Sequence, residues 1–383
     1  MWANRTRLAG QGVVLAGYSQ RDHALASRGL REVPRVASDP APPWFADWEV
    51  LSGQAVRAGK AAVISDELLV ACTTAQAERG ARSLLAAELH LVVTVRDMAS
   101  LLPAEWQESV KVGGTVPWQD WLKSVTETAP AAGRRAQSWF WTVHSTLANL
   151  DMWSQHIPPD QVHVVVVPRQ GPPDALWTRF ASVLGVDPGS TAAYPERSNP
   201  SLGLVEAEFL RRMNEALPAD LPRWYYTKTI KNFLALDQLR TRPHQARLLL
   251  PPDQEAWARE QAEILVAGLR DSKYDIVGDL ADLLPQPATG RYTVPGDLPA
   301  EQLLDVAVHA AAALADNEYR ENFGAKEPGE RPHGLRQRVS RLEWTMLNGP
   351  QTRRILRSAS NLSVVRRLRV AIWRVLMHPS RGA

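Results

Sequence analysis

Charged side chains directly follow two apolar segments of the chain, and their types suit anion binding and acid–base chemistry. Arg96 follows the run Val92-Val93-Thr94-Val95, while Asp66 and Glu67 follow Ala61-Ala62-Val63-Ile64-Ser65. An arginine guanidinium can bind a phosphate through two parallel hydrogen bonds. A carboxylate can accept a proton from a substrate hydroxyl. These positions therefore indicate an anion-binding arginine and a candidate general base.

Each of these residues also has a purely structural interpretation. Arg96 can pair with Asp97 or with a helix carboxylate, which is the common role of an exposed arginine at a strand end. Asp66 or Glu67 can cap the following helix, because an acid in the first turn is favoured by the helix dipole. The pattern alone leaves both interpretations open.

Both segments resemble buried strands of a parallel sheet. Three runs, over residues 61–65, 89–95 and 162–168, are apolar and rich in β-branched residues, as a strand covered on both faces requires. Helical patterns follow over residues 67–86, 103–112, 138–155 and 173–184. This alternation predicts right-handed βαβ units. We therefore expect an α/β fold with a doubly wound, mostly parallel sheet flanked by helices, whose strand carboxyl ends form the ligand crevice.

The rest of the chain predicts two smaller parts after this core. Further helical patterns cover residues 202–216, 253–271 and 299–315, and a stretch rich in proline and glycine covers 284–296. We expect an α/β core over 1–285 and a linker with a helix packed on the core over 286–330. A helical, arginine-rich extension is expected over 331–383.

The basic charge of the chain is concentrated in this extension. Residues 351–383 hold eight arginines and no acid, so the other residues carry 36 basic against 41 acidic groups. A nucleic-acid-binding core is therefore not expected. Residues 362–377 form an amphipathic pattern with arginines beside an apolar face. Such a helix predicts either peripheral contact with an anionic membrane or docking on its own domain.

Several classes of protein are excluded or disfavoured. The single cysteine, Cys72, excludes an intramolecular disulfide and a cysteine-rich zinc site. The nine histidines are scattered without a pair at i and i+4, so no metal site is expected. No apolar run approaches the ~20 residues of a membrane span, and the N-terminus has no secretory pattern. These features predict a cytoplasmic protein.

Over about residues 1–285 the chain resembles the bacterial sulfotransferase-like family, which has a P-loop-type α/β fold. The stretches that carry the resemblance occur in the family's order and are specific in combination. They are Trp2-Ala3-Asn4-Arg5, Val63-Ile64-Ser65-Asp66-Glu67, Val95-Arg96-Asp97 through Trp106-Gln107, Val162-His163-Val164-Val165 with Pro168, Leu176-Trp177-Thr178-Arg179-Phe180, Asn199-Pro200-Ser201-Leu202-Gly203, and Tyr274-Asp275-Ile276-Val277-Gly278-Asp279-Leu280.

The resemblance implies transfer of a sulfuryl group from 3′-phosphoadenosine 5′-phosphosulfate (PAPS) to a hydroxyl or amine of a small-molecule or glycolipid acceptor. It implies that Arg96 holds the 3′-phosphate of the donor. The family's second phosphate ligand, a serine, would fall at Ala104, and Ser100 lies one turn earlier. Glu67, or else Asp66, would act as the general base, although the family often has histidine at position 66.

The chain departs from the family at its beginning. In the family a loop resembling Lys-x-Gly-Thr-Thr joins the first strand to the first helix and binds the phosphosulfate. The stretch Trp2-Ala3-Asn4-Arg5 belongs to that first helix, and Gly53–Lys60 does not reproduce the loop. We expect that the natural protein starts upstream. The alternative is a catalytically inactive binding or scaffold protein, held at a membrane surface by its basic helix.

Overall fold

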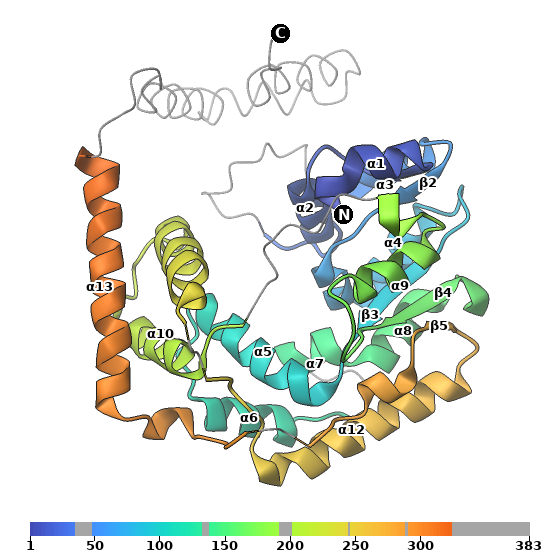
Figure 1. The fold of residues 1–383 in the computed structure, drawn as a ribbon. Coiled ribbons are helices and arrows are strands. Elements are labelled where there is room, and N and C mark those ends of the chain that lie inside the picture. The colour runs from blue at the N-terminus through green and yellow to red at the C-terminus, as the bar shows by residue number, and fades with distance from the viewer. Residues whose placement is uncertain (35–47, 132–137, 191–200, 244–245, 288–289, 324–383) are drawn as a thin grey trace. The chain divides into compact units, whose positions relative to one another are not determined.

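The computed structural model describes residues 1–34, 48–131, 138–190, 201–243, 246–287 and 290–323 (Figure 1). The chain divides into two compact units, Met1–Ala315 and Asp316–Ala383. The predicted arginine-rich extension over 331–383 lies outside the described residues, as does the amphipathic segment 362–377.

Two small parallel sheets organise the first unit. Strand β1 (Val13–Leu15) pairs with β2 (Ala61–Val63), and β3 (Leu91–Val95), β4 (Val162–Val166) and β5 (Asp275–Val277) form a second sheet in the order β3-β4-β5. All the pairings within these sheets are parallel. The prediction of an α/β fold with parallel strands flanked by helices is confirmed, with the strands divided between two small sheets.

The three predicted strands are present, each shorter than expected, but β3 is less buried than its apolar sequence predicts. In β4, Val164 and Val165 are fully buried, as expected for a strand covered on both faces. In β3, by contrast, Leu91 and Val92 are half-buried and Thr94 is exposed. The difference arises because β3 is the edge of its sheet, with a strand partner on one side among the described residues.

Helices pack around the β1–β2 sheet. They are α1 (Arg5–Gly10), α2 (Gln20–Leu30), α3 (Trp48–Val56) and α4 (Thr74–Arg82). The single helix expected over 67–86 is wrong, because the chain forms a 3₁₀ helix at Glu67–Ala71 and then turns at the buried, extended Cys72. A capping box between Thr73 and Gln76 starts α4.

The β3–β4–β5 sheet is followed by α5 (Met98–Lys111), α7 (Trp139–His144), α8 (Thr146–Ser154), α9 (Ala175–Val183) and α12 (Pro252–Asp271). Helix α5 begins five residues before the predicted start, at the cap Asp97, and accommodates Pro103 within it. The helix expected over 138–155 is divided at Ser145, whose ψ of 73° ends α7 and begins α8.

Packing places different helices against the two sheets. Leu150 of α8 and Val266 and Leu269 of α12 join one cluster with the buried side chains of β4. Helix α9 contacts β4, and its Ala181 also packs with Val13 of β1. Helix α9 therefore reaches from one sheet to the other.

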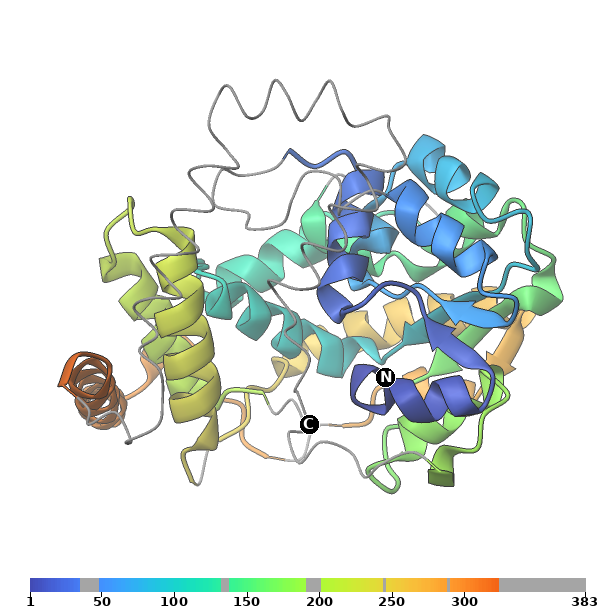
Figure 2. The same ribbon diagram turned by 90° about the horizontal axis from the view of Figure 1, so that it is seen from above.

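A mainly helical part completes the first unit (Figure 2). It contains α6 (Trp118–Glu127), α10 (Leu204–Ala216), α11 (Arg223–Tyr225), a π-helix at Tyr226–Gln238 and the first part of α13 (Ala300–Phe323). Its core includes the fully buried Trp106 and Trp118, whose rings lie edge to face 5.7 Å apart. These tryptophans are core residues and do not line a pocket between the sheets.

Within the described ranges, no helix has both the length and the apolar character that crossing a membrane requires.

Candidate functional site

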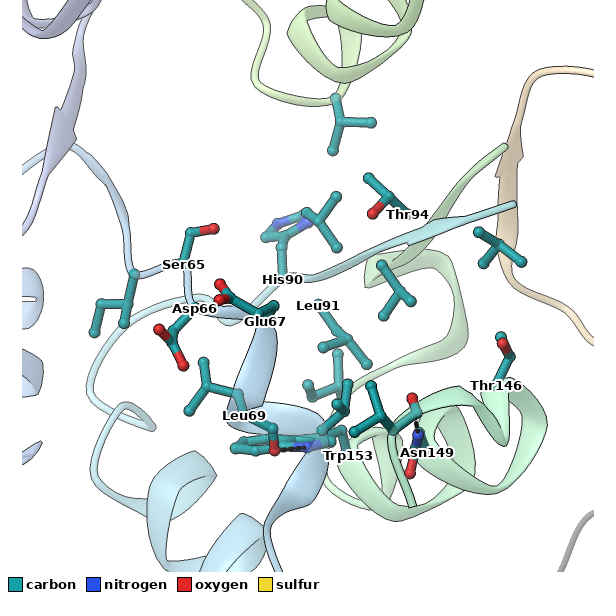
Figure 3. Close-up of a pocket in the computed structure, with 18 of the residues that line it drawn as sticks. Ser65, Asp66, Glu67, Leu69, His90, Leu91, Thr94, Thr146, Asn149 and Trp153 are labelled. Carbon is teal, nitrogen blue, oxygen red and sulfur yellow. Dashed lines mark hydrogen bonds between the residues drawn. The ribbon is translucent and has the colours of Figure 1, made fainter. Parts of the chain in front are cut away.

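A pocket of about 1130 Å³ is lined by β2 and β3 along their whole lengths. Its lining runs from Lys60 through Glu67 on the β2 side and from Glu88 through Arg96 on the β3 side. Figure 3 shows Glu67 on the segment that leaves β2, Thr94 on β3 and Asn149 on α8. The ends of both segments carry charged side chains, and the middle is apolar.

The segment after β2 separates the roles of its two carboxylates. Asp66 caps the 3₁₀ helix that follows, because its Oδ1 accepts a hydrogen bond of 3.1 Å from the Leu68 amide. Glu67 is exposed, and no hydrogen bond or ion pair involves its carboxylate among the described residues. Both side chains line the pocket. The structure thus gives Asp66 a capping role and leaves the Glu67 carboxylate available.

Arg96 lies at the end of β3, lines the pocket and is exposed. Its guanidinium has no hydrogen-bond or ion-pair partner within the described part of the chain. The Asp97 carboxylate instead caps α5, accepting from the Ser100 amide at 2.8 Å. The structural interpretation of Arg96 as a partner of Asp97 is therefore not supported.

Ser100 lies in the first turn of α5, and its side chain is not among those that line the pocket. Three of the four predicted site residues, Asp66, Glu67 and Arg96, thus face one pocket, while Ser100 stands apart. The Asp97 carboxylate already occupies the N-terminus of α5 and would repel an anion placed there.

Buried His23 on α2 holds the segment that carries the two carboxylates. Its Nε2 donates to the carbonyl of Ala16 at 2.7 Å, and its Nδ1 accepts from the Ser65 amide at 3.0 Å. One imidazole in this tautomer satisfies both bonds, so His23 ties the end of β1 to the end of β2. Sequence analysis did not single out His23, because its partners are backbone atoms brought together only by the fold.

Two buried polar atoms on the pocket wall have no hydrogen-bond partner among the described residues. They are Oγ of Ser145 and Oδ1 of Asn149, in side chains that are 9% and 4% exposed. The Asn149 amide nitrogen is bonded to the carbonyls of Thr142 and Val143. A buried polar atom without a partner is costly, so this wall favours contact with a hydrogen-bond donor.

The fold also brings together histidines that are far apart in the sequence. Nδ1 of His90 lies 2.8 Å from Nε2 of His163, and Nδ1 of His163 lies 2.7 Å from Oδ2 of Asp275. The register of β3, β4 and β5 aligns these side chains, and a single sequence cannot reveal that register. No group of three or more metal-ligating side chains is found in the part of the chain that the structure describes.

The arrangement combines a cation, a carboxylate and an apolar channel. Arg96 can bind an anionic group, and Glu67 can accept a proton from a hydroxyl or amine. Comparison with known proteins adds no assignment, because no family model, no curated protein and no solved structure matches this chain.

Proposed function

We propose that this chain is part of a cytoplasmic sulfotransferase that moves a sulfuryl group from PAPS to an acceptor hydroxyl or amine. The observation that carries the proposal is the pocket that both Arg96 and Glu67 line without a protein partner for their charged groups among the described residues. The resemblance of residues 1–285 to the sulfotransferase-like family supplies the substrate class. In this proposal the two sheets belong to one doubly wound sheet.

The proposed roles follow from the contacts of each residue. The Arg96 guanidinium pairs with the 3′-phosphate of the donor, which positions the nucleotide. The Glu67 carboxylate takes the proton of the acceptor as the acceptor oxygen or nitrogen bonds to sulfur and the bond from sulfur to the phosphate oxygen breaks. Asp66 shapes the segment through its cap, and His23 fixes the backbone of Ser65.

Calorimetry with the desulfated nucleotide, 3′-phosphoadenosine 5′-phosphate, tests the role of Arg96. The substitution Arg96→Ala is expected to weaken binding by more than tenfold, because a charge-assisted hydrogen bond is worth about 1.5–3 kcal/mol. Arg82→Ala is the matched control, since Arg82 is exposed, forms a surface pair with Glu78 and does not line the pocket. Equal affinities of the wild type and Arg96→Ala for the nucleotide would contradict the assignment.

A second candidate, a non-catalytic binding protein, is favoured by one observation. Lys60 is the only lysine among the described residues of the pocket wall. It precedes β2, whereas Asp66 and the candidate base Glu67 follow that strand, so no lysine of the pocket wall follows β2 with them. Transfer of the sulfuryl group needs positive charge beside the phosphosulfate. Incubation with radiolabelled PAPS and a panel of phenols, amines and glycolipids separates the candidates. Nucleotide binding without labelled product in any reaction supports the binding protein.

A further inference from the structure

Helix α8 begins with polar backbone groups that have no partner in the described part of the chain. Ser145 is the C-cap of α7 and the N-cap of α8, yet its side chain makes no capping hydrogen bond. The first-turn amides of Thr146, Leu147 and Ala148 have no acceptor among the described residues. The first amides of a helix have no partner within the helix itself, so they depend on a side chain, water or a ligand.

Two buried side-chain oxygens belong to the same region. Oγ of Ser145 and Oδ1 of Asn149 have no hydrogen-bond partner among the described residues, and each residue is more than nine-tenths buried. Asn149 follows Ser145 by about one helical turn, so the two residues lie on the same side of α8. Both residues and Thr146 line the pocket. The start of α8 therefore carries unsatisfied donors and acceptors on the pocket wall.

The Asn149 amide is held in one orientation by its own hydrogen bonds. Its nitrogen donates to the carbonyls of Thr142 and Val143 at 3.2 and 3.0 Å. The opposite orientation would place Oδ1 against these two carbonyl oxygens, and none of the three atoms could donate. Oδ1 can therefore only accept, and the group that it lacks is a hydrogen-bond donor.

The unsatisfied groups determine which chemical group fits them. Oδ1 of Asn149 needs a donor, whereas the amides of α8 need an acceptor. An ionised sulfate or carboxylate has no proton for Oδ1, and an ammonium group has no lone pair for the amides. A hydroxyl carries one proton and two lone pairs on a single atom, so it can satisfy both. The start of α8 thus matches an uncharged hydroxyl.

The surroundings of these groups are mainly apolar. Trp141 and Leu147 lie close to Ser145 in the chain, and both line the pocket. The ionisable neighbour His144 is engaged with α5, because its Nε2 lies 3.4 Å from Oε2 of Glu105. A hydroxyl attached to an apolar body is therefore complementary to this part of the pocket wall.

We propose that Ser145, Thr146 and Asn149 form a binding subsite for the hydroxyl group of an uncharged, apolar ligand. In this hydroxyl subsite the ligand donates to Oδ1 of Asn149 and accepts from Oγ of Ser145 and from the first turn of α8. Figure 3 shows Asn149 and Thr146 on α8, separated in this view from Glu67 on the segment after β2. The bound hydroxyl is thus distinct from a group that Glu67 deprotonates, and the inference goes beyond the proposed function.

The stability of a serine variant gives the first test. Ser145→Ala is expected to raise the melting temperature of the ligand-free chain, because it removes a buried oxygen that has no partner to lose. A serine that served as a helix cap would give the opposite result, since loss of a cap destabilises a helix. A lower melting temperature of Ser145→Ala would therefore overturn the proposal.

Ligand-observed NMR titrations of the 383-residue chain test the chemical selectivity. The probes share one ring system and are indan-2-ol, 2-methoxyindane, indane-2-carboxylate and 2-aminoindane. Indan-2-ol is expected to bind about tenfold or more tightly than each of the others, because only the alcohol pairs both kinds of buried group. The methyl ether is the sharpest comparison, since it keeps the oxygen and loses only the proton. Equal affinity for the alcohol and its ether would overturn the proposal, as would a lack of alcohol binding.

Ser27→Ala is the matched control for Ser145→Ala. Ser27 on α2 is fully buried and its Oγ also has no partner among the described residues, but Ser27 does not line the pocket. Both variants are expected to raise the melting temperature. Only Ser145→Ala is expected to lose affinity for indan-2-ol, by about tenfold. Equal affinities of the two variants for the alcohol would overturn the proposal.

These outcomes are separable from those of the proposed function. Binding of indan-2-ol is measured without nucleotide, and Arg96→Ala is expected to leave it unchanged. Alcohol binding that depends on Ser145, without labelled product from PAPS in any reaction, would support the hydroxyl subsite and count against sulfuryl transfer. Sulfuryl transfer with the same acceptor KM in the wild type and Ser145→Ala would support the transferase and count against the subsite.

Discussion

Asp66 and Glu67 are neighbours in the chain, yet their carboxylates are in different situations. Asp66 is engaged with the Leu68 amide, whereas Glu67 extends into the pocket without a partner among the described residues. The same pair of acids could thus be a cap, a base or both. The contacts separate the two residues in a way that their types and spacing could not.

This difference predicts distinct effects of substitution. Asp66→Ala is expected to lower the stability by about 1 kcal/mol, because it removes a helix cap. Glu67→Gln is expected to leave the melting temperature unchanged and to slow sulfuryl transfer by about 10²–10⁴-fold, because it removes the base. Thermal unfolding and initial rates with labelled PAPS measure the two effects.

Glu88→Gln serves as the matched control, since Glu88 is another exposed carboxylate on the pocket wall. Its oxygen accepts an exposed hydrogen bond of 3.1 Å from Gln161, which a glutamine in its place can still accept, so Glu88→Gln is expected to change neither quantity. Equal rates for Glu67→Gln and Glu88→Gln would remove Glu67 from the mechanism.

Arg96 illustrates how far residue types alone can be interpreted. The sequence indicated an anion-binding arginine at the end of an apolar strand, and it equally allowed a pair with Asp97. The structure shows that the Asp97 carboxylate is used to cap α5. The position of Arg96 on the pocket wall was therefore predictable, but its lack of a partner within the described chain was not.

At the scale of elements, α10 carries a cluster of charged side chains around the buried Glu208. This cluster makes the stability of the folded chain fall at acid pH. Arg211 donates to both carboxylate oxygens of Glu208 at 2.8 Å, and Arg212 donates to the same carboxylate at 2.7 Å. Burial raises the pKa of Glu208, but the hydrogen bonds from Arg211 and Arg212 outweigh it, and the pKa lies below its ordinary value of 4.5. Ionised Glu208 thus stabilises the folded chain.

The sign of this shift predicts the pH dependence. A folded pKa below the unfolded one contributes stability that is fully present above pH 4.5 and is lost as the pH falls through the folded pKa. Glu108 contributes in the same direction, because Lys111 and Lys231 outweigh its desolvation. Urea unfolding over a pH series from neutral to acid is expected to show stability that declines as Glu208 and Glu108 become protonated.

Glu208→Gln tests the assignment to this cluster. The variant is expected to be less stable at neutral pH by less than the ~3–5 kcal/mol of a fully broken buried pair, because Arg211 loses Glu208 but keeps the Glu215 carboxylate and the Thr115 carbonyl. Its stability is also expected to fall less steeply in acid than that of the wild type. A parallel decline in the two proteins would mean that other carboxylates control acid unfolding.

The elements also show why local patterns mislead at boundaries. The breaks at Cys72 and Ser145 lie within sequences that are helical by composition, and they reflect extended or unusual backbone angles at single residues. Strands β1 and β5, of three residues each, were not predicted, whereas β2, equally short, was predicted because it lies within the longer apolar run 61–65. Strands β3 and β4 have five residues each and were found from their apolar runs.

At the scale of the whole molecule, the division of the strands into two sheets could not be predicted. Sequence periodicity identifies strands but does not say which of them are edges, since pairing depends on contacts between distant segments. The expectation of one sheet came from the alternation of strands and helices. The structure has β2 and β3 at separate edges, and the joining of their sheets is a proposal.

The division of the chain into two units predicts the effect of truncation. Val306 and Ala310 of α13 are buried in the core of the first unit, so residues up to Phe323 are kept. A chain that ends at Phe323 is expected to melt at the same temperature as the full chain.

The truncated chain lacks the eight arginines of residues 351–383. It is therefore expected to lose salt-dependent binding to phosphatidylserine vesicles, if residues 362–377 contact membranes.

Sedimentation with phosphatidylserine and with phosphatidylcholine vesicles measures this binding. The full chain is expected to sediment with the anionic vesicles only. Equal sedimentation of the full and truncated chains would contradict a membrane role for the extension.

The open edges of β2 and β3 also have a consequence for handling the 383-residue chain. Unpaired strand edges are templates for pairing with other polypeptides, and native proteins usually shield them. The apolar residues along both edges make intermolecular association favourable once chains are concentrated. The 383-residue chain is therefore expected to aggregate during overproduction, and the yield of monomer becomes a simple report on how well these strand edges are shielded.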